Sequence, residues 1–344
     1  MKKHFLVALA VVGCLAAKAQ SNNDKEPYLT KALTNDVQKV KVETSGGSIA
    51  VEGASSSPKI EMYVNGNNSL FNKLSKDEIK KRLEDDYIVN INFSNNVLTA
   101  TAKPKERNMD WKKSLSISFK VYVPKNVSTD LATSGGSIKL ANLSGTQNFA
   151  TSGGSLNVEG ISGKIDGKTS GGSIKLSNSQ DDIDLSTSGG SIDASNCKGN
   201  IRLSTSGGSL KLNDLNGKID ASTSGGSVNG SKITGELSAH TSGGSVRLSE
   251  MACSLSTSTS GGSMDVEITQ LGKFVKISNS GGNIKLDLPK GKGLDLSLHG
   301  RKVKVNSLSN FSGNTDEDNI SGKINGGGVP VDVKAGSGTL TVNL

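Results

Sequence analysis

Thr133-Ser134-Gly135-Gly136-Ser137-Ile138 is the stretch that decides the fold, because its first four residues recur along the chain at a fixed interval. From Thr133 onward the interval is 18 residues seven times in succession, up to Thr259. An earlier copy begins at Thr44, and a variant, Asn279-Ser280-Gly281-Gly282, follows the last copy after 20 residues. A short period kept this strictly predicts a stacked repeat, in which each unit is too small to bury its own apolar residues and uses its neighbours.

Apolar residues keep fixed places within one period when the Thr is counted as position 0. They occupy positions 5 and 7, position 10, and positions 14 and 16, as in Ile174, Leu176, Ile183 and Leu185. This alternation predicts two short strands with inward apolar side chains. Gly at positions 2 and 3, and often at 12, predicts corners where the backbone has a positive φ or bends tightly.

Two strands and two corners in 18 residues make one coil of a solenoid. We therefore predict an all-β fold, a single-stranded parallel β-solenoid (β-helix) with 18-residue coils and a small helix-bearing N-terminal cap. In such a fold Ile174, Ile192 and Leu210 stack in adjacent coils. Hydrophobic residues are 33% of the chain and aromatic residues 3%, which fits a narrow interior filled by aliphatic side chains.

The Thr-Ser-Gly-Gly string itself is predicted to be structural. Continuing the alternation 14, 16, 18 points the Thr inward and the following Ser outward. The Thr hydroxyls can then hydrogen-bond to neighbouring coils near the corner. Replacing Gly207 by Val is predicted to be costly if φ is positive there. Replacing Ser206 by Ala should cost no more than about 0.5 kcal/mol.

The outward position 6 carries charges of both signs. Neighbouring coils lie about 4.8 Å apart, so opposite charges stack next to each other. We interpret this row as a device that fixes the register, or as an ordinary solvated surface. Its members are Lys139, Asn157, Lys175, Asp193, Lys211, Asn229, Arg247 and Asp265.

The flanks depart from the repeat. Ser75-Lys76-Asp77-Glu78 is a capping-box pattern and predicts a helix that ends at about Asp86. Ile88–Phe93 and Val97–Ala100 read as strands joined by a turn, and the alternation from Leu115 to Val123 predicts another strand. The predicted organisation is a signal peptide (1–19), a flexible lead-in (20–35), N-terminal capping coils with a helical insertion (36–129), regular repeats (130–288) and degenerate closing coils (289–344).

The N-terminus reads as an export signal. Lys2, Lys3 and His4 are followed by a short apolar run and by the small residues around Lys18 that suit cleavage after Ala19. Val11-Val12-Gly13-Cys14 offers an alternative, a lipobox in which Cys14 is lipidated and attaches the protein to a membrane. Either reading predicts an exported protein of the periplasm, outer membrane surface or extracellular space.

Charge argues against nucleic acid as a partner. The formal net charge of +8 falls to +5 when Lys2, Lys3 and Lys18 are removed with the signal. The remaining basic residues alternate with acidic ones, and aromatic stacking residues are scarce.

No catalytic, cofactor-binding or metal-binding residues are predicted. Cys197 and Cys253 lie about three coils apart, roughly 14 Å along the axis, which is too far for a disulfide. His240 and His299 lack an acid and a nucleophile at informative spacing. Asp is absent from the Gly-Gly turns, which argues against bound calcium.

One group of carboxylates keeps an enzymatic alternative open. Asp166, Asp184 and Asp220 share an outward row interrupted by Arg202. Stacked carboxylates could bind a cation or a sugar, and glycan-cleaving enzymes group such residues on one face. A structural row of charges is the favoured interpretation.

The chain resembles the bacterial putative-adhesin family of β-strand-repeat proteins, a domain-of-unknown-function group. The matching residues are Leu115–Pro124 leading into Thr133–Ile138, the 18-residue iterations, and the strand pair in Ile88–Ala102. The resemblance implies an envelope or secreted β-solenoid, with adhesion proposed by analogy of shape and no catalytic residues. We therefore expect a non-enzymatic surface protein that presents an extended binding face to a glycan or protein. The alternatives are a polysaccharide-processing β-helix and a purely structural envelope spacer.

Overall fold

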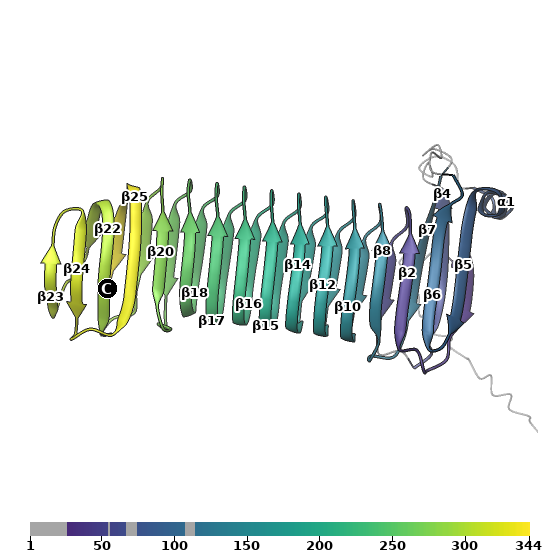
Figure 1. Cartoon of the computed structure of the whole chain (residues 1–344), viewed down its shortest axis with the longest axis horizontal. Coiled ribbons are helices and arrows are strands. Elements are labelled where there is room, and N and C mark those ends of the chain that lie inside the picture. Colours follow the sequence, from purple (N-terminus) through teal and green to yellow (C-terminus); the bar gives the residue numbers. More distant parts are fainter. Residues whose placement is uncertain (1–25, 54–55, 67–73, 107–113) are drawn as a thin grey trace, which may run out of the picture.

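The described part of the chain is almost entirely β. The structure, a computed structural model, describes residues 26–53, 56–66, 74–106 and 114–344. In these ranges 25 strands form one hydrogen-bonded sheet and one helix lies beside it. Figure 1 shows the strands side by side along the long axis of the molecule. The predicted signal peptide and Cys14 lie outside the described residues.

The 18-residue repeats stack in parallel and in register. Ile174 pairs with Ile192, and Ile192 with Leu210, as predicted. We call one repeat a rung. The early rungs have two separate strands and the later ones a single long strand that bends. The strands are β8 (Ser128–Thr133), β9 (Ile138–Ala141), β10 (Ser144–Thr151), β11 (Leu156–Glu159), β12 (Ser162–Thr169), β13 (Ile174–Ser177), β14 (Gln180–Thr187), β15 (Ile192–Thr205), β16 (Leu210–Thr223), β17 (Val228–Thr241) and β18 (Val246–Thr259).

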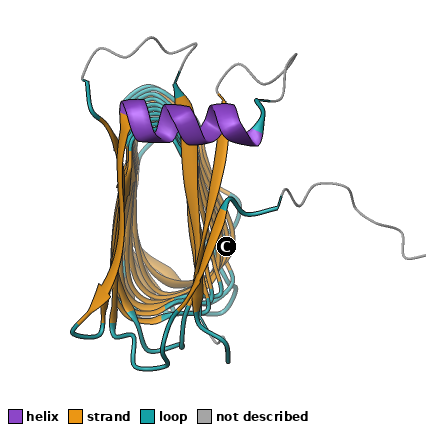
Figure 2. Ribbon diagram, turned by 90° about the vertical axis from the view of Figure 1, so that its right-hand side faces the viewer, coloured by secondary structure: helices purple, strands orange, loops and turns teal. Residues whose placement is uncertain are grey.

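Each rung contributes to two walls that face each other across the core. The short-strand wall contains β9, β11, β13 and the first parts of β15 to β18. The long-strand wall contains β8, β10, β12, β14 and the last parts of β15 to β18. Figure 2 shows the two walls from the end of the molecule, joined by turns at both edges. The inward Ile and Leu residues are buried, and this continuous apolar interior stabilises the stack.

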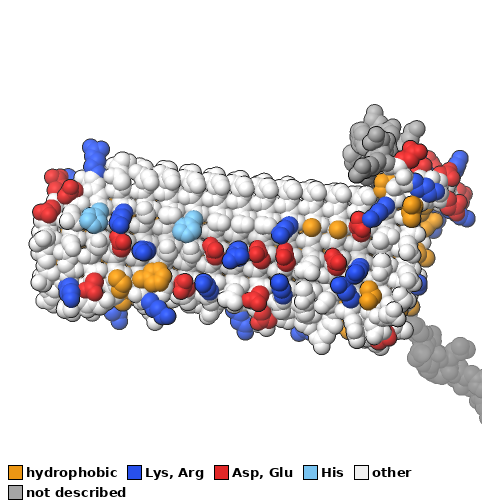
Figure 3. All heavy atoms as spheres, in the orientation of Figure 1, with side chains coloured by type: hydrophobic (Ala, Val, Ile, Leu, Met, Phe, Trp, Pro, Cys, Tyr) orange, Lys and Arg blue, Asp and Glu red, His pale blue; other side chains and the backbone are white. Residues whose placement is uncertain are grey.

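The Thr-Ser-Gly-Gly corner joins one wall to the other through a repeated set of hydrogen bonds. Thr205 is buried, and its hydroxyl donates to the Gly190 carbonyl of the preceding rung at 2.8 Å. The same hydroxyl accepts from the Gly208 amide at 3.2 Å. The predicted inward orientation of the Thr is therefore confirmed. Ser206 is exposed, and the rim above the array in Figure 3 carries no charged side chain.

The two corner glycines have a role other than a left-handed backbone. Neither Gly207 nor Gly208 has a positive φ, so of the two predicted alternatives, a positive φ or a tight bend, the first does not apply at positions 2 and 3. A Cβ on Gly208 would lie only 2.0 Å from the Gly190 carbonyl oxygen. A Cβ on Gly207 would lie 3.5 Å from the nearest backbone oxygen, an ordinary contact. The second Gly is needed because the backbones of adjacent rungs approach closely there.

Positive φ occurs instead in the bend between the walls. Gly at position 12 has it, as predicted, with φ of 118° at Gly199 and 127° at Gly217. Position 9 has it as well, and the sequence analysis did not identify this column. Its members are Asn142, Gly160, Asn178, Asn196, Asp214, Lys232 and Glu250.

The N-terminal end contains a rung that is separated from its neighbour in the chain. β2 (Lys39–Thr44) pairs with β8, and β3 (Ile49–Glu52) pairs with β9, so the early copy at Thr44 joins the array directly. The chain between them makes an excursion that covers the outer side of this rung. It contains β4 (Lys59–Gly66), α1 (Lys76–Asp86), β5 (Tyr87–Ser94), β6 (Val97–Pro104) and β7 (Leu115–Tyr122).

Two predictions for this end can be checked. The helix is confirmed, because α1 begins after Ser75, whose hydroxyl accepts from the Glu78 amide at 3.2 Å. The flexible lead-in over residues 20–35 is wrong for part of its length. β1 (Leu29–Ala32) pairs antiparallel with β4, because the edge of β4 offers unpaired backbone groups to it.

The C-terminal end repeats this arrangement. After β19 (Met264–Ile268), β20 (Val275–Asn279) and β21 (Ile284–Asp287), the chain leaves as β22 (Leu294–Val305), β23 (Phe311–Thr315) and β24 (Asn319–Ile324). It then returns as β25 (Val329–Asn343), which pairs in parallel with β20 and β21 on one side and with β22 on the other. The last strand therefore lies between strands that precede it.

Candidate functional site

The outward side chains of the short-strand wall form two rows, at positions 6 and 8 of each rung. In the position-6 row a cation stands on every second rung, and this alternation continues into both ends. Because rungs are about 4.8 Å apart, cations recur about every 9.6 Å. The order across the wall is Lys120, Ala50, Lys139, Asn157, Lys175, Asp193, Lys211, Asn229, Arg247, Asp265, Lys285, Thr341, Lys304.

Ion pairs along this row are few. Among the described residues, Lys285 lies 3.6 Å from Asp265 on the next rung and 2.8 Å from Asp287 on its own. The hydrogen bond to Asp287 raises the pKa of Lys285. Lys175, Lys211 and Arg247 are exposed and have no carboxylate within 4.0 Å in the described part of the chain. The register places Asp193 between Lys175 and Lys211 as predicted, but among the described residues ion pairs within 4.0 Å occur in this row only near its C-terminal end.

The middle of this wall is positively charged. Over five rungs it has three cations and one carboxylate, with hydroxyl and amide side chains between them. We call this surface the central patch. Its members are Lys175, Ser177, Asp193, Ser195, Lys211, Asn213, Asn229, Ser231, Arg247 and Ser249.

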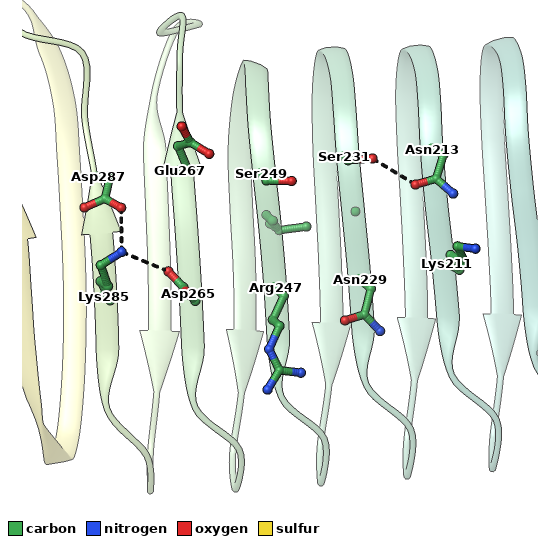
Figure 4. A pocket seen from close by; sticks show the side chains of 12 residues that line it. Lys211, Asn213, Asn229, Ser231, Arg247, Ser249, Asp265, Glu267, Lys285 and Asp287 are labelled. Atoms are coloured by element: carbon green, nitrogen blue, oxygen red, sulfur yellow. Dashed lines mark hydrogen bonds and ion pairs between the residues drawn. The ribbon is translucent and has the colours of Figure 1, made fainter.

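A shallow depression of about 620 Å³ lies at the C-terminal end of the central patch. Figure 4 shows its residues, with Lys211 and Arg247 two rungs apart and Asn229 between them. The depression exists because Asn229, Ser231 and Ser249 are short while the flanking cations are long. In Figure 4 neither Lys211 nor Arg247 is joined to another lining residue by an interaction. Lys211, Arg247 and the short polar residues between them are thus available to a ligand, while Asp265, Glu267, Lys285 and Asp287 line the C-terminal side of the depression.

Aromatic residues gather at the N-terminal end of the same wall. Lys59 lies over the ring of Tyr122 at 5.0 Å, and Lys120 over the ring of Tyr63 at 4.9 Å. Glu61 accepts from Tyr63 at 2.7 Å and pairs with Lys59 at 2.7 Å. Burial raises the pKa of Glu61, but its bonds to Lys59 and Tyr63 outweigh burial and lower the pKa overall. These groups satisfy one another and form a closed cluster.

The long-strand wall carries the carboxylates considered for catalysis. The register places Asp166, Asp184, Arg202 and Asp220 in one row, as predicted. Arg202 lies 3.7 Å from Asp184 and 3.9 Å from Asp220 and so bridges them. A depression of about 580 Å³ surrounds this row. Figure 3 shows that charges of both signs are mixed over this wall.

The two histidines have mostly hydroxyl partners. Nε2 of His240 lies 2.9 Å from Ser238 Oγ, and Nδ1 lies 2.8 Å from Ser258 Oγ. Both ring nitrogens are thus occupied by hydroxyls, and neither is hydrogen-bonded to a carboxylate. His299 is exposed, with Ser297 3.3 Å from its Nε2. The Ser–His contacts lack the orienting acid of a catalytic triad.

Cys197 and Cys253, the cysteines in the described ranges, are free and buried. Burial raises the pKa of the Cys197 thiol, and it raises that of Cys253 to about 11. No group of three or more His, Cys, Asp or Glu residues suited to a metal ion occurs in the described ranges. No helix among the described residues is long and apolar enough to span a bilayer.

Comparison with known proteins gives similarity to solved structures only. No protein-family profile matches the chain, and neither does any curated protein sequence. A putative cell adhesion protein from Clostridium sporogenes ATCC 15579 is 11% identical, with 92% of this chain and 97% of that one covered and a TM-score of 0.19.

Two further solved structures are similar. A putative adhesin from Bacteroides fragilis NCTC 9343 is 11% identical, with 92% and 96% of the two chains covered and a TM-score of 0.27. A putative adhesin from Parabacteroides merdae ATCC 43184 is 15% identical, with 91% and 95% covered and a TM-score of 0.29. Their names are those of the family that the repeats of this chain resemble.

Proposed function

We propose that this chain is an exported, non-enzymatic β-solenoid of the bacterial cell envelope or surface, and that it binds a partner through the short-strand wall. The single observation that carries the proposal is the central patch, where Lys175, Lys211 and Arg247 have no carboxylate partner among the described residues. A wall whose charges only fixed the register would pair them with each other. Adhesion, the role in the names of the similar structures, is part of this proposal.

The adhesive role is tested with beads that carry the purified protein. Beads with wild-type protein should be retained on bacterial or host-cell surfaces more strongly than beads with an unrelated all-β protein of similar charge. The K175Q/K211Q/R247Q variant should lose most of this retention. Equal retention of wild-type and unrelated beads would refute the proposal and favour a purely structural envelope spacer.

Export is tested by the mass of the mature protein. Cleavage after Ala19 leaves Gln20 as the first residue, whereas lipidation removes residues 1–13 and adds acyl chains to Cys14. We propose the first form. A mature N-terminus at Cys14 with acyl chains would replace it and would place the protein on a membrane. Recovery of the unprocessed chain in the cytoplasm would contradict both.

A second candidate is a polysaccharide-processing enzyme acting on the long-strand wall. It is favoured by the depression around Asp184 and Asp220, which lie two rungs apart, about 9.6 Å between backbones. Inverting glycosidases hold their carboxyl groups about 6.5–9.5 Å apart. Arg202 bridges the two carboxylates and so opposes a catalytic role. Cleavage of a glycan in a panel, abolished by Asp184→Asn or Asp220→Asn, would make this the function.

A further inference from the structure

In the position-6 row of the short-strand wall, a cation occurs on every second rung. This holds even where neighbouring rungs are not consecutive in the chain. Lys120 and Lys304 belong to the excursions at the two ends, yet both keep the alternation. At the C-terminal end, Lys285 and Lys304 are separated by Thr341 from the returning strand β25. A sequence repeat of 36 residues cannot produce this continuity, since these rungs come from different parts of the chain.

Charge repulsion within the wall does not explain the alternation by itself. Cations on adjacent rungs would repel at about 4.8 Å, so spacing them is favourable. Pairing every cation with an acid would be more favourable still. However, the rungs between the cations carry Ala50, Asn157, Asn229 and Thr341, and only Asp193 and Asp265 are acidic. The row as a whole therefore keeps an excess of positive charge.

The opposite wall provides an internal comparison. Over the same five rungs as the central patch, its outward residues include three cations, Lys198, Arg202 and Lys218, and five carboxylates. Arg202 there is bridged to carboxylates on both sides. Over these rungs the central patch therefore has an excess of cations, whereas the opposite wall has an excess of carboxylates. The five carboxylates are Asp181, Asp182, Asp184, Asp220 and Glu236.

We propose that the central patch binds a linear acidic polysaccharide that carries one negative charge on every second sugar. This deepens the proposed function, on which it rests, by naming the ligand class. The repeat of about 9.6 Å between cations is of the order of the length of an extended disaccharide. The hydroxyl and amide groups of Asn213, Asn229 and Ser231 lie between the cations, where they would face the uncharged sugar.

Several weak contacts along one polymer explain how an exposed surface could bind firmly. Single exposed ion pairs contribute little because water and salt screen them. A chain that already pairs with Lys175 presents its next charge to Lys211 at high effective concentration. Affinity should therefore rise with oligosaccharide length up to the length of the row and should fall as salt increases.

The test measures binding of purified full-length protein to immobilised polymers. Hyaluronan carries a carboxylate on every second sugar, polygalacturonate carries one on every sugar, and dextran is neutral. We expect binding to hyaluronan, weaker binding to polygalacturonate and none to dextran. The K175Q/K211Q/R247Q variant should bind hyaluronan about tenfold more weakly, as the sum of three exposed charge contacts.

Two variants separate this site from general electrostatic attraction. K164Q/R202Q/K218Q removes three cations from the long-strand wall and should bind within about twofold of wild type. K211N/N229K keeps the charge of the central patch but moves one cation by a rung, and should bind about threefold more weakly. Thermal melts of all variants establish that they are folded.

Four results would contradict the proposal or part of it. Equal loss in the two triple variants, or DNA binding as strong as hyaluronan binding, would reduce the interaction to net charge and overturn the proposal. Unchanged binding of K211N/N229K would overturn the two-rung spacing. If no acidic polysaccharide binds while protein-coated beads still adhere, this inference fails and the proposed function stands. If the beads also fail to adhere, the proposed function fails.

Discussion

The regular array and the two ends of this molecule are built from the same kind of rung, but they differ in how far apart neighbouring rungs lie in the sequence. In the array each rung pairs with the one 18 residues later. At each end two adjacent rungs are separated in the chain by an excursion, residues 54–127 on one side and 288–328 on the other. The difference teaches that hydrogen-bonding register, and not proximity in sequence, decides which strands become neighbours.

The largest expected effect comes from removing the strand that the C-terminal end inserts between earlier ones. Deleting residues 329–344 leaves β20 and β22 without the strand that joins them. We expect backbone amides of residues 294–324 to exchange hydrogen about 100-fold faster, while the array stays protected.

The matched control deletes residues 206–223, one complete rung of the array. It joins Thr205 to Ser224 and restores the repeat, so protection at both ends should be kept. Undiminished protection of residues 294–324 after the first deletion would mean that β22 stacks on the array directly, in chain order.

Within the array, the largest single-residue effect should come from Gly208→Ala. The new Cβ would lie 2.0 Å from the Gly190 carbonyl oxygen, and both are backbone positions that cannot move independently. We expect a loss of about 3 kcal/mol in the free energy of unfolding, as for severe overpacking. Gly207→Ala, with 3.5 Å to the nearest oxygen, should cost less than about 0.5 kcal/mol. Chemical denaturation of the two variants measures both losses. Similar losses in the two would contradict the close backbone contact at Gly208.

Thr205→Val should have an intermediate effect. It removes the donor to Gly190 and the acceptor for Gly208 and leaves both backbone groups without these partners in a half-buried corner. The expected loss is about 1–3 kcal/mol. Thr44→Val at the N-terminal rung removes the bond to the Ile117 carbonyl and should cost less. Ser206→Ala is the exposed control, and a loss equal to that of Thr205→Val would show that the hydroxyl bonds do not stabilise the corner.

The smallest effect concerns acid sensitivity at the junction between the array and the C-terminal end. Asp287 on β21 accepts a hydrogen bond from Asn343 on β25 and pairs with Lys285. Burial opposes ionisation, but these two partners lower the pKa of Asp287 below its ordinary 3.8. Its contribution is therefore present above the unfolded pKa and is lost as pH falls through the folded pKa.

Because Asp287 is partly exposed, its contribution should be less than about 1 kcal/mol. Asp287→Asn should reduce stability near neutral pH and should make the melting temperature less dependent on pH below about 4. Asp193→Asn, in the array, is the control. Identical pH profiles for the wild type and Asp287→Asn would refute the contribution.

The strands of the array could be predicted from the sequence because the same pattern of inward apolar residues recurs in every rung. Each inward Ile or Leu meets the same environment in every rung, so the period of positions 5, 7, 14 and 16 identifies the strands. The Asn and Asp residues at position 9, such as Asn178 and Asp214, could have been identified as left-handed positions, since these residue types favour that conformation. Lys232 and Glu250 occupy the same position with a positive φ, but these residue types do not favour that conformation, so they make the column harder to recognise in the sequence.

The arrangement of the ends, and the continuation of the position-6 row into them, could not be predicted from the sequence in the same way. Val331 and Val333 alternate as any strand would, and nothing in their spacing says that β25 pairs on both sides. The two-rung alternation can be seen in the sequence from Lys139 to Asp265, but its continuation into the ends becomes visible only when Lys120 and Lys304 are placed by pairing. The sequence also could not decide between the causes of the corner glycines, because a missing side chain does not reveal whether a positive φ or close backbone contact requires it.

Both excursions lie at the ends of the array, so the number of rungs between them can change without changing the capping structures. Both capping structures connect to the array through rungs whose neighbours are set by register, while the rungs between them have equivalent backbone pairing. Duplication or loss of one 18-residue segment would change the reach of the protein by about 4.8 Å and leave its caps intact. Gain or loss of whole repeats would therefore produce a graded series of longer and shorter proteins, each with the same caps, from which selection could choose a length.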